Sequence, residues 1–344
     1  MVDPPAAGAN ASAIASPRGN LAALDLGTNN CRLLIARPEG DNFVIVDAFS
    51  RIVRLGEGLA STGRLSDAAI ERTVSALSVC ADKLRRRRVV LARSVATEAC
   101  RRAENGAEFV DRVHRETGIM LDIISAQEEA RLAVLGCQTL LEPGDGPALI
   151  FDIGGGSTEL ALLDGSQPGA AIVDWESAPW GVVSLTEAAS GHEDSAAGRA
   201  AAYAQMRETM RRAFAPFAER LPAQGPVRLL GTSGTVTTLA TVFLGLPRYD
   251  RQAVDGLIVP AEEMRAIAAR LSGMSIAERR GLPCIGEERA DLVVAGCAIL
   301  ESILDIWPAA RLGVADRGIR EGILRMLLGS RAIRRAPRHE SVAA

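Results

Sequence analysis

The sequence predicts an α/β protein in which two domains enclose a cleft. The prediction comes from two nearly identical segments, Asp25-Leu26-Gly27-Thr28-Asn29-Asn30 and Asp152-Ile153-Gly154-Gly155-Gly156-Ser157, each preceded by an apolar run and followed by an alternating one. After both segments the expected elements follow in the same order: a hairpin, a third strand, a polar helix and a further strand. The chain of 344 residues is 48% hydrophobic, which is enough for two buried cores.

Each of the two segments is expected to form the tip of a β-hairpin. Residues 21–24 and 148–151 have the pattern of strands that enter a tight turn, and 31–36 and 158–163 that of strands that leave it. Glycine permits backbone angles at which successive N–H groups converge on an anion. The pattern therefore predicts two phosphate-binding turns that face each other across the cleft, with the leading aspartates placed to hold a metal ion through water.

Helix starts define most of the remaining elements of the first unit. Ser66 precedes apolar positions at helical spacing, and Ser125-Ala126-Gln127-Glu128 has the pattern of a capping box. The expected elements are the strand 42–49, the Gly-rich loop 55–65, a helix from 66 to about 88, the strand 89–92, helices from about 101 and over 109–117, the strand 119–124 and the helix 130–140.

The second unit begins after the turn-forming residues 142–146. We expect a third strand at 171–176, a helix over 195–221, a strand at 227–230, a Gly-rich turn at 231–235 that leads into the helix 236–244, a helix over 289–304, a strand at 312–315 and a helix over 318–328. The predicted domain organisation is a disordered leader at 1–20, a first domain at 21–142, a second domain at 143–330 and a disordered tail at 331–344.

Composition excludes several classes of function. The net charge of -3 gives no broad attraction to nucleic acid or anionic membranes, and 3% aromatic residues leave few stacking platforms for bases, so sequence-specific nucleic-acid binding is not expected. Lys83 is the only lysine and has neither a P-loop nor a kinase strand around it. His114, His192 and His339 lack zinc-type spacing.

The sequence also favours a cytoplasmic location. The six cysteines include no Cys-x-x-Cys pair, the first twenty residues do not have the pattern of a signal peptide, and no apolar run reaches the length of a membrane span. We therefore expect no membrane partner and a reducing compartment.

Glu129 is the candidate catalytic residue. If Ser125 caps the helix, Glu128 folds back onto the capping backbone and Glu129 projects freely. The positive field of a helix N-terminus would keep that carboxylate ionised, ready to orient and deprotonate a water molecule beside a bound phosphate. The alternative is that both are ordinary acids of a first helical turn.

Several basic segments have two interpretations. Arg101 follows a turn of small residues, and its guanidinium group can reach phosphate oxygens. Arg32 either contacts phosphate in the same way or points to solvent. For single arginines in an Arg-rich chain, exposure to solvent is the default. The Arg85–Arg88 run is typical of a solvated helix end. The turn 231–235 either presents N–H groups to a phosphate or is only a tight turn.

Together, four segments resemble the exopolyphosphatase and guanosine pentaphosphate phosphohydrolase family, a branch of the superfamily of actin, sugar kinases and heat-shock chaperones. The resemblance covers about residues 21–328 and implies two ribonuclease H-like domains in the short form of the family. The segments are Ala23-Leu24-Asp25-Leu26-Gly27-Thr28-Asn29, Val95-Ala96-Thr97-Glu98-Ala99-Cys100-Arg101, Ile124-Ser125-Ala126-Gln127-Glu128-Glu129-Ala130-Arg131 and Phe151-Asp152-Ile153-Gly154-Gly155-Gly156-Ser157-Thr158-Glu159.

The resemblance also implies residue roles. Glu129 would be the general base, and Mg²⁺ or another divalent cation would be positioned by Asp25 and Asp152, with Glu159 as a further metal ligand. The terminal phosphates would be held by Gly27, Thr28, Asn29, Arg101, Gly154, Gly155, Gly156, Ser157 and Thr158. The landmarks around Arg251, Asp255, Arg289 and Arg320 are expected to be structural, and a homodimer is expected from the resemblance alone.

Asn30 and Cys31 depart from the small or polar residues that the family commonly has at this tip, and no role is predicted for them.

The expected activity is hydrolysis that releases terminal orthophosphate from inorganic polyphosphate. The alternative substrate is guanosine pentaphosphate, which offers a terminal phosphate to the same turns. Two other classes stay open: a phosphotransferase of the sugar or acetate kinase type, and a nucleotide sensor without catalysis.

Overall fold

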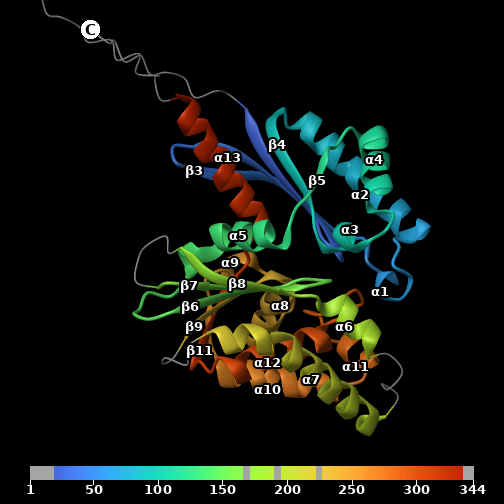
Figure 1. Cartoon of the computed structure of the whole chain (residues 1–344), viewed down its shortest axis with the longest axis vertical. Helices are drawn as coiled ribbons and strands as arrows, with labels where there is room; N and C mark the ends of the chain where they lie inside the picture. Colours follow the sequence, from blue (N-terminus) through green and yellow to red (C-terminus); the bar gives the residue numbers. More distant parts are fainter. Residues whose placement is uncertain (1–18, 166–170, 190–194, 222–226, 336–344) are drawn as a thin grey trace, which may run out of the picture.

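The computed structural model describes residues 19–165, 171–189, 195–221 and 227–335. Its two mixed β-sheets lie one above the other, each with helices packed against it, and α5 (Ala126–Cys137) lies between them (Figure 1). Within the described residues, no helix is both long and apolar enough to cross a membrane.

The first sheet has the spatial order β3-β2-β1-β4-β5. An antiparallel meander forms one side of the sheet, and β4 and β5 continue it parallel to β1. The strands are β1 (Asn20–Leu26), β2 (Asn30–Glu39), β3 (Asn42–Ile52), β4 (Val89–Ala96) and β5 (Leu121–Ile123).

Alternation along β1 divides the first core into two layers. Ala22, Leu24 and Leu26 pack on the face covered by α2 and α4, whereas Leu21 and Ala23 pack on the face covered by α5 and α13. Asp25 continues the second set and therefore belongs to the face on which α5 lies. The helices are α1 (Leu59–Thr62), α2 (Asp67–Arg86), α3 (Glu98–Arg102), α4 (Gly106–Thr117) and α13 (Ile319–Arg335).

The second sheet has the spatial order β10-β11-β9-β6-β7-β8. Its strands are β6 (Ala148–Ile153), β7 (Thr158–Leu163), β8 (Ile172–Ala178), β9 (Arg228–Thr232), β10 (Ile258–Pro260) and β11 (Arg311–Ala315). The helices are α6 (Val182–Ala188), α7 (Ala196–Arg220), α8 (Ser233–Phe243), α9 (Arg251–Val254), α10 (Ala261–Gly273), α11 (Ile276–Arg280) and α12 (Val293–Ile306), and a 3-10 turn, η1 (Gln138–Leu140), follows α5.

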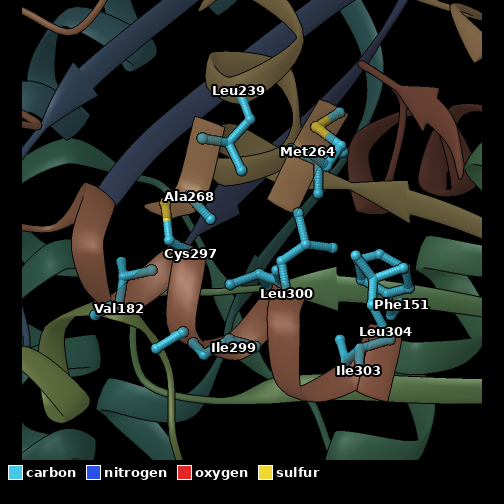
Figure 2. Close-up of a cluster of buried hydrophobic side chains, with 14 of the residues drawn as sticks. Phe151, Val182, Leu239, Met264, Ala268, Cys297, Ile299, Leu300, Ile303 and Leu304 are labelled. Carbon is cyan, nitrogen blue, oxygen red and sulfur yellow. The ribbon is translucent and has the colours of Figure 1, made fainter. Parts of the chain in front are cut away.

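The second sheet is divided in the same way as the first. Leu149, Phe151 and Ile153 of β6 pack into the large core built with α8, α10 and α12, part of which Figure 2 shows around Phe151 and Leu300. Ile150 packs on the other face, against α5. Asp152 follows Ile150 by two residues, so it also belongs to the α5 face. The period of two therefore directs Asp25 and Asp152 toward the helix that carries Glu129.

Every strand expected from the sequence is present, most with slightly longer bounds. The helices α1, α6, α9, α10 and α11 and the strand β10 were not expected. The tail prediction is wrong for its first residues, because α13 continues to Arg335, and 336–344 lie outside the described residues. Of the predicted leader, Asn20 is already part of β1, and 1–18 lie outside the described residues.

The helix α13 was expected in the second domain, but it packs on the first sheet and crosses α5 closely. A Cβ atom on Gly136 would lie 2.0 Å from the Gly318 oxygen, and one on Gly322 would lie 2.0 Å from the Leu132 oxygen. Because these two glycines have no side chains, the backbone of α5 can contact the backbone at the start of α13. The division of the chain at residue 142 stays a prediction.

Gly322→Ala is therefore expected to push α13 away from α5 and to lower the free energy of unfolding by about 1–3 kcal/mol, the usual cost of overpacking. Denaturant unfolding measures the change. Gly329→Ala in the same helix is the matched control, because nothing lies within 4 Å of a Cβ atom there, and it should be neutral or slightly stabilising. Equal stability of the two variants would contradict the close crossing.

Candidate active site

The tips of the two duplicated hairpins have the same turn. The Gly27 N–H donates to the Asn30 oxygen at 2.9 Å, and the Gly154 N–H donates to the Ser157 oxygen at 3.0 Å. The two tips also touch: a Cβ atom on Gly155 would lie 3.0 Å from the Asn29 nitrogen. The predicted pair of facing turns is thus what the structure contains.

Both tips line a cleft of about 1120 Å³, a volume that includes its open mouth. Side chains and backbone from both sheets line it, together with the first turn of α5 and of α8. The residues proposed from the sequence that line this cleft are Asp25, Gly27, Thr28, Asn29, Glu129, Asp152, Gly154, Gly155, Gly156, Ser157 and Glu159.

Two proposed phosphate-binding residues do not line the cleft. Thr158 is buried and donates its hydroxyl to the Trp180 oxygen at 2.8 Å. Arg101 forms an ion pair with Glu129, with 3.2 Å between its Nη2 and the Glu129 Oε2. It also forms an ion pair with Glu98 and donates a hydrogen bond to the Ile124 oxygen. Arg101 therefore contacts the candidate base in this structure, and its predicted contact with phosphate stays a prediction.

The first tip carries buried acceptor atoms that have no hydrogen-bond partner: Asp25 Oδ1, Thr28 Oγ1 and Asn29 Oδ1. Leaving one buried polar atom unpaired costs about 1–3 kcal/mol. Three such atoms at one turn are typical of a site whose side chains bind a ligand rather than one another.

Four of the carboxyl groups that line the cleft, those of Asp25, Glu129, Asp152 and Glu159, have raised pKa values. Burial raises the pKa of Asp25, and burial together with the nearby Asp25 raises the pKa of Asp152 to about 6. Burial and Asp152 raise the pKa of Glu159 to about 7. Crowded acids of this kind favour a cation or a proton between them.

Glu129 lies where the sequence predicts, in the first turn of α5, but its pKa is shifted in the opposite direction to the one expected. Ser125 caps α5, accepting from the Glu128 N–H, and the Glu129 side chain is 9% exposed. Burial and the nearby Glu159 raise the pKa of Glu129 well above the usual value, against the pull of Arg101. The prediction that the helix field alone keeps it ionised is therefore wrong, since desolvation outweighs a helix dipole.

Glu128 does not fold back onto the capping backbone. Its carboxylate bonds Arg93 at 2.9 Å and Arg131 at 2.7 Å, because these guanidinium groups offer charged donors where the capping backbone offers only a neutral N–H. The expected division between the two acids still holds in outline, since only Glu129 lines the cleft.

Four arginines line the cleft: Arg32, Arg289, Arg317 and Arg320. The sequence favoured exposure for Arg32 and a structural role for Arg289 and Arg320, and no prediction was made for Arg317. Hairpin register could have found Arg32, because it pairs with Asp25 across the hairpin as Glu159 pairs with Asp152, and paired residues share a face. Burial lowers the pKa of Arg320. Arg251 and Asp255 pair with Glu321 and Arg317, and the structural role expected of their segments stays a prediction.

Comparison with known proteins agrees with this geometry. Residues 34–331 match the Ppx/GppA phosphatase family. Exopolyphosphatase 2 of Mycobacterium tuberculosis is 32% identical over 325 residues, which cover 90% of this chain and 98% of that protein.

Solved structures agree as well. The Aquifex aeolicus member of the Ppx/GppA family superimposes with a TM-score of 0.73 at 28% identity, over 91% of this chain and 98% of that one. An exopolyphosphatase from Cytophaga hutchinsonii superimposes with a TM-score of 0.81 at 24% identity, over 90% and 98% of the two chains. The predicted fold class, two ribonuclease H-like domains with a cleft between them, is confirmed. The chain belongs to the Ppx/GppA phosphatase family and is a hydrolase of that family.

Proposed function

We propose that this protein is an exopolyphosphatase that releases terminal orthophosphate from inorganic polyphosphate by the attack of water. The observation that carries the proposal is the buried carboxylate of Glu129 in a cleft that both hairpin tips line. The similarity to an exopolyphosphatase supports it. None of the described residues that line the cleft is aromatic, so the lining offers arginines and backbone donors but no platform for a guanine base.

In this mechanism the backbone N–H groups of both tips bind the terminal phosphoryl group, and Arg32 and Arg320 neutralise its charge and that of the next phosphate. Glu129 holds the attacking water in line with the departing polyphosphate chain and accepts a proton from that water. Arg101, in contact with Glu129, favours the ionised form of that carboxylate.

The carboxylates of the cleft fit a divalent cation bound largely through water. Asp25 Oδ1 lacks a partner, and Asp152 and Glu159 stand opposite each other on one hairpin. Among the described residues, no three His, Cys, Asp or Glu side chains lie close enough together to surround an ion directly. When bound, Mg²⁺ would supply charge neutralisation at the phosphoryl oxygens.

Such a site predicts how the stability of the metal-free protein depends on pH. The folded pKa values of Asp152 and Glu159, about 6 and about 7, lie above those of unfolded carboxyl groups. The stability that these groups contribute is fully present below the unfolded values and is lost as the pH rises through the folded ones. In a chelator, Tm should therefore fall between pH 5 and pH 8.

Thermal unfolding with and without Mg²⁺ measures this effect. Mg²⁺ should restore Tm at pH 8 and change it little at pH 5, and Glu159→Gln should flatten the pH dependence of the metal-free protein. A Tm that does not respond to Mg²⁺ at pH 8 would argue against cation binding by these carboxylates.

Phosphate release from polyphosphate and from guanosine pentaphosphate, at matched concentrations of terminal phosphate, tests the choice of substrate. We expect a higher kcat/KM for polyphosphate and no need for an acceptor molecule. A strong preference for the guanosine compound would assign that activity instead. Release that requires a sugar or acetate acceptor would indicate a phosphotransferase, and tight binding without turnover would indicate a sensor.

A further inference from the structure

Ser233, at the junction of β9 and α8, has an unusual backbone conformation. Its φ of +83° lies in the left-handed region that residues with a side chain rarely adopt. Among the described non-glycine residues, only Arg54 and Arg88 also have positive φ. A glycine at this position would avoid the strain, so the serine side chain must offer something that glycine does not.

The Ser233 hydroxyl contacts the base of the second tip. It donates to the Ile153 oxygen at 2.5 Å, where β6 ends and the glycine turn begins. Ile153 directly follows Asp152, whose side chain lines the same cleft as Ser233. A hydroxyl has one hydrogen, and Ser233 donates it to this carbonyl oxygen.

The surroundings of Ser233 are rigid. A Cβ atom on Gly231 would lie 2.7 Å from the Phe151 ring, and the Thr232 hydroxyl donates to the Arg317 oxygen at 2.5 Å. Ser233 itself lines the cleft. The turn from β9 to α8 is thus tied both to β6 and to the segment that leads into α13.

We propose that Ser233 is a positioning residue for the hydrolytic reaction. Its hydroxyl, presented by a left-handed backbone, fixes the Ile153 carbonyl, and with it the end of β6 that carries Asp152 and the start of the glycine turn, in the geometry that holds the terminal phosphoryl group. The proposal rests on the proposed function, since it assigns Ser233 a part in the same site. Ser233 acts through its neighbours and is not itself a group that reacts.

Ser233→Gly separates this role from a purely structural one. Removing the side chain relieves the strained φ, so Tm should stay equal or rise, whereas kcat should fall at least about tenfold with KM changed by less than about threefold. Mg²⁺ binding, measured by calorimetry on the metal-free variant, should weaken. Arg88→Gly is the matched control: it relieves a φ of +50° outside the cleft lining and should leave kcat unchanged.

Ser233→Ala completes the test, because it keeps the Cβ atom and the strain but removes the hydroxyl. We expect the same fall in kcat as for glycine, with a Tm no higher than that of the wild type. Wild-type kcat in Ser233→Ala would overturn the proposal, as would a loss in KM alone, and this variant decides if Ser233→Gly does not fold. If wild-type protein releases no phosphate from polyphosphate, the proposed function fails, while Mg²⁺ binding by the two Ser233 variants still tests the positioning of the end of β6 that carries Asp152.

Discussion

Glu129→Gln is expected to reduce the rate of phosphate release at least about a hundredfold, the contribution that a general base typically makes. Glutamine keeps the shape of the side chain but cannot accept the proton of the attacking water. Because burial and Glu159 raise the pKa of Glu129, removing its charge should leave Tm unchanged or raise it. Steady-state kinetics and thermal unfolding of the same preparation measure both effects.

Glu128→Gln is the control for that experiment. Glu128 is the preceding residue on α5, but its carboxylate pairs with Arg93 and Arg131 and does not line the cleft. We expect wild-type kcat and a loss of stability of less than about 1 kcal/mol, as is usual for partly exposed ion pairs. Equal kinetic losses in the two variants would mean that Glu129 has no special role.

Gly156→Val should have an effect of similar size for a different reason. A Cβ atom on Gly156 would lie 2.6 Å from the Thr28 Oγ1 and 3.1 Å from the Glu98 Cγ, so a branched side chain has to force the two tips apart. A misplacement of about 1 Å in a site that depends on orientation can cost about a hundredfold in rate. We therefore expect kcat/KM for polyphosphate to fall by about that factor.

The change in Gly156→Val should appear in activity more than in folding, because the tips lie at the open cleft rather than in either core. Circular dichroism should stay native, and Gly329→Ala, where the added methyl meets nothing, should keep wild-type kcat/KM. Wild-type activity in Gly156→Val would show that the contact between the tips does not matter for the reaction.

The sequence predicts those parts of the site that depend on residues close together in the chain. The hairpin tips at Gly27 and Gly154 follow from glycine and flanking alternation, and the cap at Ser125 follows from side-chain chemistry. Strand period then puts Asp25 and Asp152 on faces that look toward α5.

What the sequence does not predict depends on contacts between distant segments. The pKa of Glu129 is set by burial and by Glu159, a residue of the other sheet. Arg320 enters the cleft because α13 returns to the first sheet, and that packing rests on Gly322 meeting the backbone of α5. The partners of Glu128 likewise come partly from β4, through Arg93. None of these contacts has a local signature.

The source of the new oxygen atom in the released phosphate identifies the attacking group. In water enriched in ¹⁸O, we expect wild-type protein with Mg²⁺ and no acceptor to release orthophosphate from polyphosphate of defined length. Each released orthophosphate should carry one solvent oxygen, and the chain should shorten one unit at a time from its end. Cleavage in the middle of the chain, or phosphate without solvent ¹⁸O, would contradict a terminal phosphoryl group held between two turns and attacked by a water molecule that Glu129 aligns.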